Sequence, residues 1–325
     1  MPPEGTVTLL TFASRSDDSQ QTMAEEIRAG LLRRPRELPC KYFYDKRGSE
    51  LFDQITRLPE YYLTRMEADI LRGSVDEIAA LVRPEVIVEL GAGFCTKSRL
   101  LIAAARSQGT LQTFVPVDVS PDALEEATPL LRREFAGLQV RGLVAEFDDV
   151  AEVPRFGRQL VVFLGSTIGN LDDDARARFL SGIRAVLEPG DAFLVGVDLV
   201  KDPGDLNAAY NDSAGVSAEF NRNLLHVLNR ELGANFDVDS FEHTSAYSPE
   251  RKRIETDLRS KRRQSVRIPA CELAVEFDAG ELIRTEISVK FERAALAEEL
   301  RSAGLELRQW FTDPAQWFAL ALATV

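Results

Sequence analysis

A glycine-rich turn in the middle of the chain carries the first sign of chemistry. The residues Glu89-Leu90-Gly91-Ala92-Gly93 follow a short apolar run and precede a predicted helix over 97–105. Glycines there let the backbone pass close to a ligand, at the point where doubly wound sheets bind nucleotides. A dinucleotide fingerprint needs a third glycine three residues after Gly93, but Thr96 stands there. The turn therefore predicts cofactor binding and argues against NAD.

Polar and aromatic residues at the next strand ends extend this candidate site. Asp118 ends the second apolar run, where an acid can accept from ribose hydroxyls, and Glu146 with Phe147 follows the third, where an acceptor and a ring could flank adenine. Lys97, at the start of the helix after the turn, could meet a ligand carboxylate. Their order along the chain favours S-adenosylmethionine as cofactor. In the purely structural alternative the glycines form only a tight turn and Lys97 is a solvated helix residue.

Asn170 stands at the end of the fourth apolar run, in Gly165-Ser166-Thr167-Ile168-Gly169-Asn170. A side-chain amide can accept a hydrogen bond from an ammonium and donate one to a carboxylate at the same time, so this position suits an amino acid substrate. The alternative is a loop residue that makes an Asx turn. The chain has no NPPY-like element of the kind used on base amino groups, which argues against nucleic-acid modification.

The surrounding elements indicate how these residues are positioned. Apolar strands alternate with amphipathic helices, which predicts a parallel doubly wound α/β sheet with strands at 86–90, 113–119, 140–145, 160–164 and 192–199 and helices at 97–105, 121–135 and 172–187. A helix at 294–303 and a strand pair, 305–311 and 317–325, close the chain as an antiparallel hairpin. This ending resembles the class I S-adenosylmethionine-dependent methyltransferase fold. The flanks differ: 20–80 and 201–232 look helical, and 254–259, 266–277 and 285–291 look like antiparallel strands.

Composition narrows the range of partners and compartments. The 325 residues include 39 Lys+Arg and 52 Asp+Glu, a formal charge of −13. An acidic surface repels phosphate backbones and anionic lipid, so we expect neither nucleic acid nor membrane as a partner, and we expect a monomer. Cys40, Cys95 and Cys271 are widely spaced, so we expect no metal site. Without a long apolar run or a signal-peptide pattern, the chain is expected in the cytoplasm.

Several long stretches are similar to one enzyme family, the histidine-specific Nα-methyltransferases of ergothioneine biosynthesis. They are LPCKYFYDKRGSELFDQITRLPEYYLTRMEADIL (38–71), VVFLGSTIGNL (161–171), DLVKDP (198–203), GVSAEFNRNLLHVLNRELGANFD (215–237) and TEISVKF (285–291). The likeness covers nearly the whole chain. It implies trimethylation of the α-amino group of L-histidine to hercynine, with a methyltransferase domain over 66–200 plus 289–325 and a discontinuous substrate-binding domain over 1–65 plus 201–288.

The resemblance also assigns roles to individual residues. It places the cofactor on Gly91, Lys97, Asp118, Glu146 and Phe147, although the family commonly has Asp where this chain has Glu146. For the substrate, the resemblance places the amino and carboxylate groups on Tyr61, Asn170 and Tyr210, and the imidazole ring on Glu286 and Ser288. It gives catalytic roles to Asn170 and to Tyr44, which would lie near the amine.

One departure bears on the substrate ring. Where the family carries Met near the imidazole pocket, the stretch 254–257 of this chain has Thr256. Two alternatives therefore stand beside histidine methylation. One is an Nα-methyltransferase for another aromatic amino acid such as tryptophan, and the other is a cofactor-binding sensor that has lost turnover.

Overall fold

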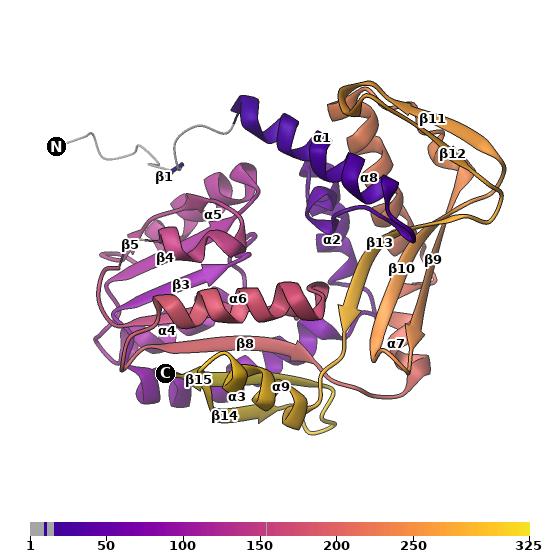
Figure 1. The fold of residues 1–325 in the computed structure, drawn as a ribbon. Helices are drawn as coiled ribbons and strands as arrows, with labels where there is room; N and C mark the ends of the chain where they lie inside the picture. Colours follow the sequence, from indigo (N-terminus) through magenta and orange to yellow (C-terminus); the bar gives the residue numbers. More distant parts are fainter. Residues whose placement is uncertain (1–9, 12–15, 154) are drawn as a thin grey trace. The chain divides into compact units, whose positions relative to one another are not determined.

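The main sheet is parallel because its strands are buried on both faces and helices connect them. In the computed structural model, which describes residues 10–11, 16–153 and 155–325, every residue of the strands β3, β7 and β8 is buried. The strands and connecting helices follow one another along the chain (Figure 1) as β3 (Val86–Leu90), α4 (Ser98–Ser107), β4 (Thr113–Asp118), α5 (Pro121–Glu134), β6 (Leu143–Val144), β7 (Gln159–Phe163), α6 (Asp173–Val186) and β8 (Ala192–Asp198).

An antiparallel hairpin closes this sheet. Helix α9 (Arg293–Ser302) leads into β14 (Glu306–Thr312) and β15 (Phe318–Thr324), and β15 pairs antiparallel with β8 from Phe318 opposite Asp198 to Thr324 opposite Ala192. The strand order is β6-β4-β3-β7-β8-β15-β14. That order, with only the β15 pairings antiparallel in this run, is the class I S-adenosylmethionine-dependent methyltransferase fold, so the expected fold class is confirmed.

Helix-start signals in the sequence act as predicted in this part of the chain. The Ser120 hydroxyl accepts from the backbone N–H of Ala123 at 3.3 Å, with Pro121 in the first turn of α5. The Asp172 carboxylate accepts from the backbone N–H of Ala175 at 2.8 Å and caps α6. These caps fix where each helix begins behind its strand end.

A second group of elements combines helices with an antiparallel sheet. Its helices are α1 (Ser16–Leu32), the 3₁₀ turn η1 (Cys40–Phe43), α2 (Lys46–Ile55), α7 (Pro203–Tyr210) and α8 (Val216–Leu232). Its main sheet has the order β2-β13-β10-β9, with β2 (Arg36–Glu37), β9 (Phe241–Ser248), β10 (Arg253–Ser260) and β13 (Leu282–Val289), and β11 (Gln264–Ile268) pairs with β12 (Leu273–Phe277). Helix α8 packs on α2, η1 and β9.

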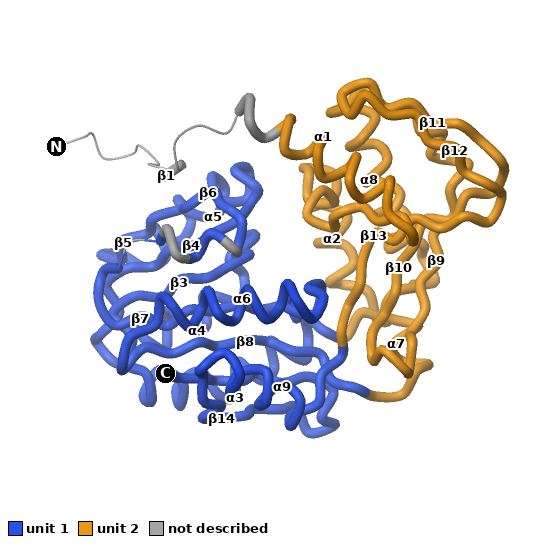
Figure 2. The backbone as a smooth tube through the Cα atoms, in the orientation of Figure 1, with its two compact units in different colours: residues 1–12, 63–200, 290–325 blue, residues 13–62, 201–289 orange. Residues whose placement is uncertain are grey.

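The chain divides into two compact units (Figure 2). Unit 1 holds β1 (Leu10–Thr11), residues 63–200, which begin with α3 (Leu63–Val82), and residues 290–325; unit 2 holds residues 16–62 and 201–289. The sequence-based division, with 66–200 plus 289–325 as the methyltransferase domain and 1–65 plus 201–288 as the substrate-binding domain, stays a prediction. Strand β1 pairs parallel with β6 of unit 1, at an edge that offers unpaired backbone groups to an extended segment.

Two strand predictions need correction, and one strand was not predicted. The predicted strand 140–145 is two short strands, β5 (Gln139–Val140) and β6, separated by Arg141 and Gly142. The predicted strand 266–277 is the β11–β12 hairpin, broken at Pro269, which has no N–H for a ladder bond. Strand β9 was not predicted because its sequence, FEHTSAYS, has no alternating apolar face.

Candidate functional site

The glycine turn after β3 has the backbone conformation that favours glycine. Gly91 and Gly93 have φ values of 66° and 50°, and a Cβ added at Gly93 would meet no atom within 4 Å. The backbone N–H of Gly93 donates to Asp118 Oδ2 at 2.7 Å, while Asp118 Oδ1 accepts from the N–H of Ser120 at 2.9 Å. The acid that ends β4 is therefore fixed beside the turn that ends β3.

A buried carboxylate from α3 connects this turn to a second loop. Glu67, which is 0% exposed, pairs through Oε2 with the ammonium of Lys97, the N-cap residue of α4. Its Oε1 accepts from the backbone N–H of Gly165 at 2.8 Å. Gly165 precedes the 3₁₀ turn η3 (Thr167–Asn170), which ends at Asn170. One side chain thus positions both the candidate cofactor lysine and the loop that carries Asn170.

Sequence reasoning missed Glu67, although a signal was present. It lies at helical spacing among the residues that α3 buries, Leu63, Ile70, Leu71 and Ser74. An acid on the apolar face of an amphipathic helix needs a buried partner, because an isolated charge there is costly.

The carboxyl ends of β3 and β4 form an acidic environment. Burial raises the pKa of Glu89 to about 7, although its hydrogen bond from the Ser98 hydroxyl and the nearby Lys97 ammonium act in the opposite direction. Burial also raises the pKa of Asp118, against the backbone N–H groups of Ser120 and Gly93. Asp118 and Glu67, joined by Glu89 where the pH is high enough to ionise it, outnumber Lys97, which favours a ligand with a cationic centre.

The residues after β6 lie beside the same turn. The ring of Phe163 lies 4.0 Å from a Cβ added at Gly91, and its centroid is 5.4 Å from that of Phe147. Phe147 also packs edge-on against Phe179 at 5.8 Å. The backbone N–H of Glu146 donates to Asp149 Oδ2 at 3.3 Å. Unit 1 therefore brings Gly91, Lys97, Asp118 and the Glu146-Phe147 pair to the same strand ends.

Unit 2 gathers the three tyrosines that sequence reasoning singled out. Ring centroids follow one another from Tyr44 to Phe52 at 5.6 Å, from Phe52 to Tyr61 at 6.3 Å, and from Tyr61 to Tyr210 at 6.4 Å. Phe220 of α8 closes the group, 5.6 Å from Tyr44 and 5.9 Å from Phe52. The two phenylalanines were not predicted. They pack the tyrosines into a continuous aromatic surface.

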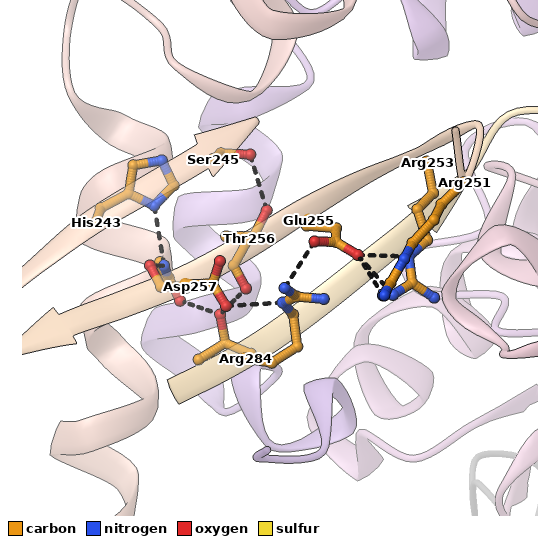
Figure 3. A network of polar contacts seen from close by, with 10 residues as sticks. His243, Ser245, Arg251, Arg253, Glu255, Thr256, Asp257 and Arg284 are labelled. Atoms are coloured by element: carbon orange, nitrogen blue, oxygen red, sulfur yellow. Dashed lines mark hydrogen bonds and ion pairs between the residues drawn. The ribbon is translucent and has the colours of Figure 1, made fainter. Parts of the chain in front are cut away.

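This aromatic surface continues onto β13. The Tyr210 hydroxyl hydrogen bonds to Ser288 Oγ at 2.8 Å, and Ser288 shares a strand face with Glu286, two residues away. Thr256 on β10 lies directly opposite Glu286 in the antiparallel pairing. Its hydroxyl is 2.9 Å from that of Ser245 on β9 (Figure 3). Tyr44, Tyr61, Tyr210, Glu286 and Ser288 are thus all in unit 2.

Ion pairs fix the strand register next to Glu286. The register of β10 against β13 shifts between Thr256 and Asp257. Arg284 spans this bulge, with Nε 2.7 Å from Asp257 Oδ1 and Nη2 2.8 Å from Glu255 Oε2 (Figure 3). Glu255 also pairs with Arg253 at 2.6 Å. The bulge is a device that re-aims side chains, here at the position facing Glu286.

The described residues provide neither a metal-binding cluster nor a membrane-spanning helix. Within residues 10–11, 16–153 and 155–325, no cluster of His, Cys, Asp and Glu has the arrangement needed to hold a metal ion. In the same part of the chain, no helix combines the length and apolar character that crossing a membrane requires.

Comparison with known proteins identifies related sequences. Residues 23–325 match the family described as "Histidine-specific methyltransferase, SAM-dependent". The chain is 48% identical to a histidine N-alpha-methyltransferase of Mycobacterium tuberculosis (94% of this chain, 96% of the relative) and 48% identical to one of Mycolicibacterium smegmatis (95% and 96%). Ergothioneine biosynthesis protein 1 of Neurospora crassa is 32% identical over 67% of this chain and 27% of its own length. Among solved structures, the CcbJ methyltransferase from Streptomyces caelestis aligns with a TM-score of 0.45 at 16% identity, over 79% of this chain and 89% of that chain.

The raised pKa of Glu89 predicts a pH-dependent stability. Because the folded-state pKa lies near 7, above the ordinary 4.5, folding loses stability as the pH rises from 4.5 through 7. Glu89→Gln removes this loss. We expect the melting temperature of the variant, relative to wild type, to rise by roughly 2–4 °C between pH 5 and pH 8.

Differential scanning calorimetry at both pH values measures this difference. Glu125→Gln, at an exposed position of α5, serves as the control and should follow wild type. If the melting temperatures of Glu89→Gln and wild type change equally between pH 5 and pH 8, the raised pKa of Glu89 is contradicted.

Proposed function

Because the chain belongs to the family of histidine-specific, S-adenosylmethionine-dependent methyltransferases, we propose that it transfers three methyl groups from S-adenosylmethionine to the α-amino nitrogen of L-histidine. The product is hercynine, and the reaction is the first step of ergothioneine biosynthesis. The observation that carries the proposal is the hydrogen bond from Tyr210 to Ser288, on the strand face that bears Glu286. This hydrogen bond joins Tyr210, proposed to bind the amino or carboxylate group of the substrate, to the strand face of Ser288 and Glu286, which are proposed to bind its ring.

The residues of unit 1 fit S-adenosylmethionine. Gly91 and Gly93 have positive φ values, and a side chain at Gly93 would point into open space. Asp118, which accepts from the backbone N–H groups of Gly93 and Ser120, can also accept from a ribose hydroxyl. Lys97 would hold the methionine carboxylate. Glu146 and Phe147 would bind the adenine. The three nearby carboxylates suit the positive charge of a sulfonium.

The residues of unit 2 fit an amino acid with a ring that forms hydrogen bonds. Glu286 and Ser288 offer an acceptor and a hydroxyl on one face, so an imidazole can engage both of its nitrogens. Tyr61 and Tyr210 would hold the amino and carboxylate groups. Thr256, opposite Glu286, would limit the space beyond the ring.

Catalysis by this chain is mainly alignment and desolvation. S-adenosylmethionine supplies a methyl group on a sulfonium, which an amine attacks in line. The substrate ammonium must first lose a proton, so contact with a neutral amide such as that of Asn170, rather than with a carboxylate, favours the reactive neutral amine. Tyr44 would lie near that amine, and its ring face can accommodate the growing methylammonium by cation–π contact.

Composition supports the remaining parts of the proposal. The formal charge of −13 disfavours contact with nucleic acid and anionic membranes. We also propose that the enzyme acts on its small-molecule substrate as a monomer in the cytoplasm.

Asp118→Ala should weaken S-adenosylmethionine binding by about 1–3 kcal/mol, because the change removes a charged acceptor for the ribose hydroxyls. Titration calorimetry measures the affinity. Asp122→Ala, at an exposed position in the first turn of α5, is the matched control. Unaltered cofactor affinity in folded Asp118→Ala protein would show that the strand-end assignment is wrong.

Glu286→Ala should lower kcat/KM for histidine roughly 10- to 100-fold, because one imidazole nitrogen loses its charged partner. The wild type should use phenylalanine very poorly, since that ring offers no hydrogen bond to Glu286 or Ser288. The variant should gain relative activity toward tryptophan, because removal of the carboxylate makes room for an indole.

Steady-state kinetics with histidine, phenylalanine and tryptophan provide the comparison, and Glu276→Ala, at an exposed position of β12, is the control. Equal efficiency for the three amino acids in the wild type would contradict histidine as the substrate while leaving methyl transfer in place.

A further inference from the structure

Asn221 of α8 is a buried polar residue whose side chain forms hydrogen bonds with three other elements. Its side chain is 2% exposed. Its Nδ2 lies 2.9 Å from His243 Nδ1 and donates to the backbone carbonyl of Asp257 at 3.0 Å, while its Oδ1 accepts from the Thr285 hydroxyl at 2.7 Å. One amide therefore connects α8 with β9, β10 and β13. Figure 3 shows His243 and Asp257 within this network.

These contacts determine the protonation state of His243. The backbone carbonyl of Asp257 can only accept, so it requires the Asn221 amide nitrogen on its side, and the same nitrogen, a donor, faces His243 Nδ1. Nδ1 must then accept and carry no proton. The other ring nitrogen, Nε2, lies 3.0 Å from the backbone carbonyl of Tyr210, an acceptor, and must carry the proton. His243 is thus the neutral Nε2–H tautomer.

The surroundings of His243 favour the neutral form. Burial lowers the pKa of His243, the carbonyl of Tyr210 acts in the opposite direction, and of the two charged groups that face the ring, Arg222 of α8 lowers the pKa and Asp212 before α8 raises it. On the neighbouring strand β10 the residue opposite His243 is the buried Leu258. A proton on Nδ1 would face the Asn221 amide hydrogens.

We call Asn221 and its three hydrogen-bond partners, His243, Asp257 and Thr285, the hub. Each partner is hydrogen bonded to, or adjacent in sequence to, a residue of the proposed substrate pocket. His243 holds the backbone of Tyr210, at the end of α7, whose hydroxyl hydrogen bonds to Ser288. Thr285 precedes Glu286 on β13, and its hydroxyl oxygen also lies 3.1 Å from the backbone carbonyl oxygen of Thr256. The hub therefore fixes the helix end and both strands that carry the proposed histidine contacts.

We propose that His243 is a positioning residue for substrate: as the neutral Nε2–H tautomer set by Asn221, it holds the Tyr210 carbonyl and so aligns the Tyr210 hydroxyl with Ser288 and Glu286. This inference rests on the proposed function, because it assigns to histidine binding the geometry that His243 maintains. A histidine suits the role because it accepts at one ring nitrogen and donates at the other.

The tautomer can be observed directly in the wild-type protein. The chain has two histidines, His226 and His243, so ¹⁵N-histidine labelling gives two ring systems, and His226→Gln, at an exposed position of α8, identifies which is which. We expect His243 to show an unprotonated Nδ1 and a protonated Nε2 at pH 7.5. A proton on Nδ1, or rapid exchange between tautomers, would overturn the proposal.

Two substitutions separate positioning from a purely structural role. His243→Asn can keep an acceptor for Asn221 but loses the donor to Tyr210, whereas His243→Gln can keep the donor to Tyr210 but loses the acceptor for Asn221. Each removes one hub hydrogen bond, so we expect similar losses of melting temperature. The KM for histidine should rise roughly 3- to 10-fold in His243→Asn and less in His243→Gln, with the Kd for S-adenosylmethionine unchanged in both.

Equal KM values in the two folded variants, or a cofactor Kd that changes together with KM, would overturn the positioning role. Wild-type turnover of histidine is measured first, with His226→Gln as the control for substitution of a histidine. Absence of that turnover would overturn the proposed function, whereas the tautomer experiment tests His243 without any substrate.

Discussion

A single buried carboxylate, that of Glu67, sets the geometry at the strand ends of unit 1. A charge with no solvent exposure is tolerated only with close partners, and Glu67 has two, the Lys97 ammonium and the Gly165 backbone N–H. The first lies at the start of α4, after the glycine turn, and the second precedes the loop that ends at Asn170. Helix α3 thereby fixes two turns that are far apart in the sequence.

In unit 2 the buried polar side chain that connects neighbouring elements is the neutral amide of Asn221. Asn221 supplies two donated bonds and one accepted bond from α8, and its partners lie on three strands of the antiparallel sheet. Nearby, Arg284 spans the β10–β13 bulge by pairing with Asp257 and Glu255. Hydrogen-bond networks around such buried groups rigidify the neighbouring side chains. In each unit, one buried polar side chain of a helix thus orders the residues proposed to contact ligand.

The sequence allowed prediction of the elements whose hydrophobic period is strong and of the residues at their ends. Strand β3 was predicted with its observed bounds, and Asp118 was singled out because it ends β4. Strand β9 lacked an apolar face, and the β11–β12 break depended on a single proline. Glu67 and His243 were missed for a different reason: their partners are distant in sequence, and only tertiary packing shows which face of α3 or α8 meets which turn. The resemblance to the family supplied Tyr61, Tyr210 and Glu286, which periodicity alone does not distinguish from ordinary strand and helix residues.

The central claim is that this chain methylates the α-amino nitrogen of histidine and leaves the ring untouched. The most direct measurement incubates the purified protein with S-adenosylmethionine and L-histidine carrying ¹⁵N at the α position only, and follows the products by mass spectrometry and by ¹H–¹⁵N correlation of the new methyl groups. The account predicts successive addition of one, two and three methyl groups, all coupled to the labelled nitrogen. Methyl groups on an imidazole nitrogen, or no methylated histidine at all, would contradict it.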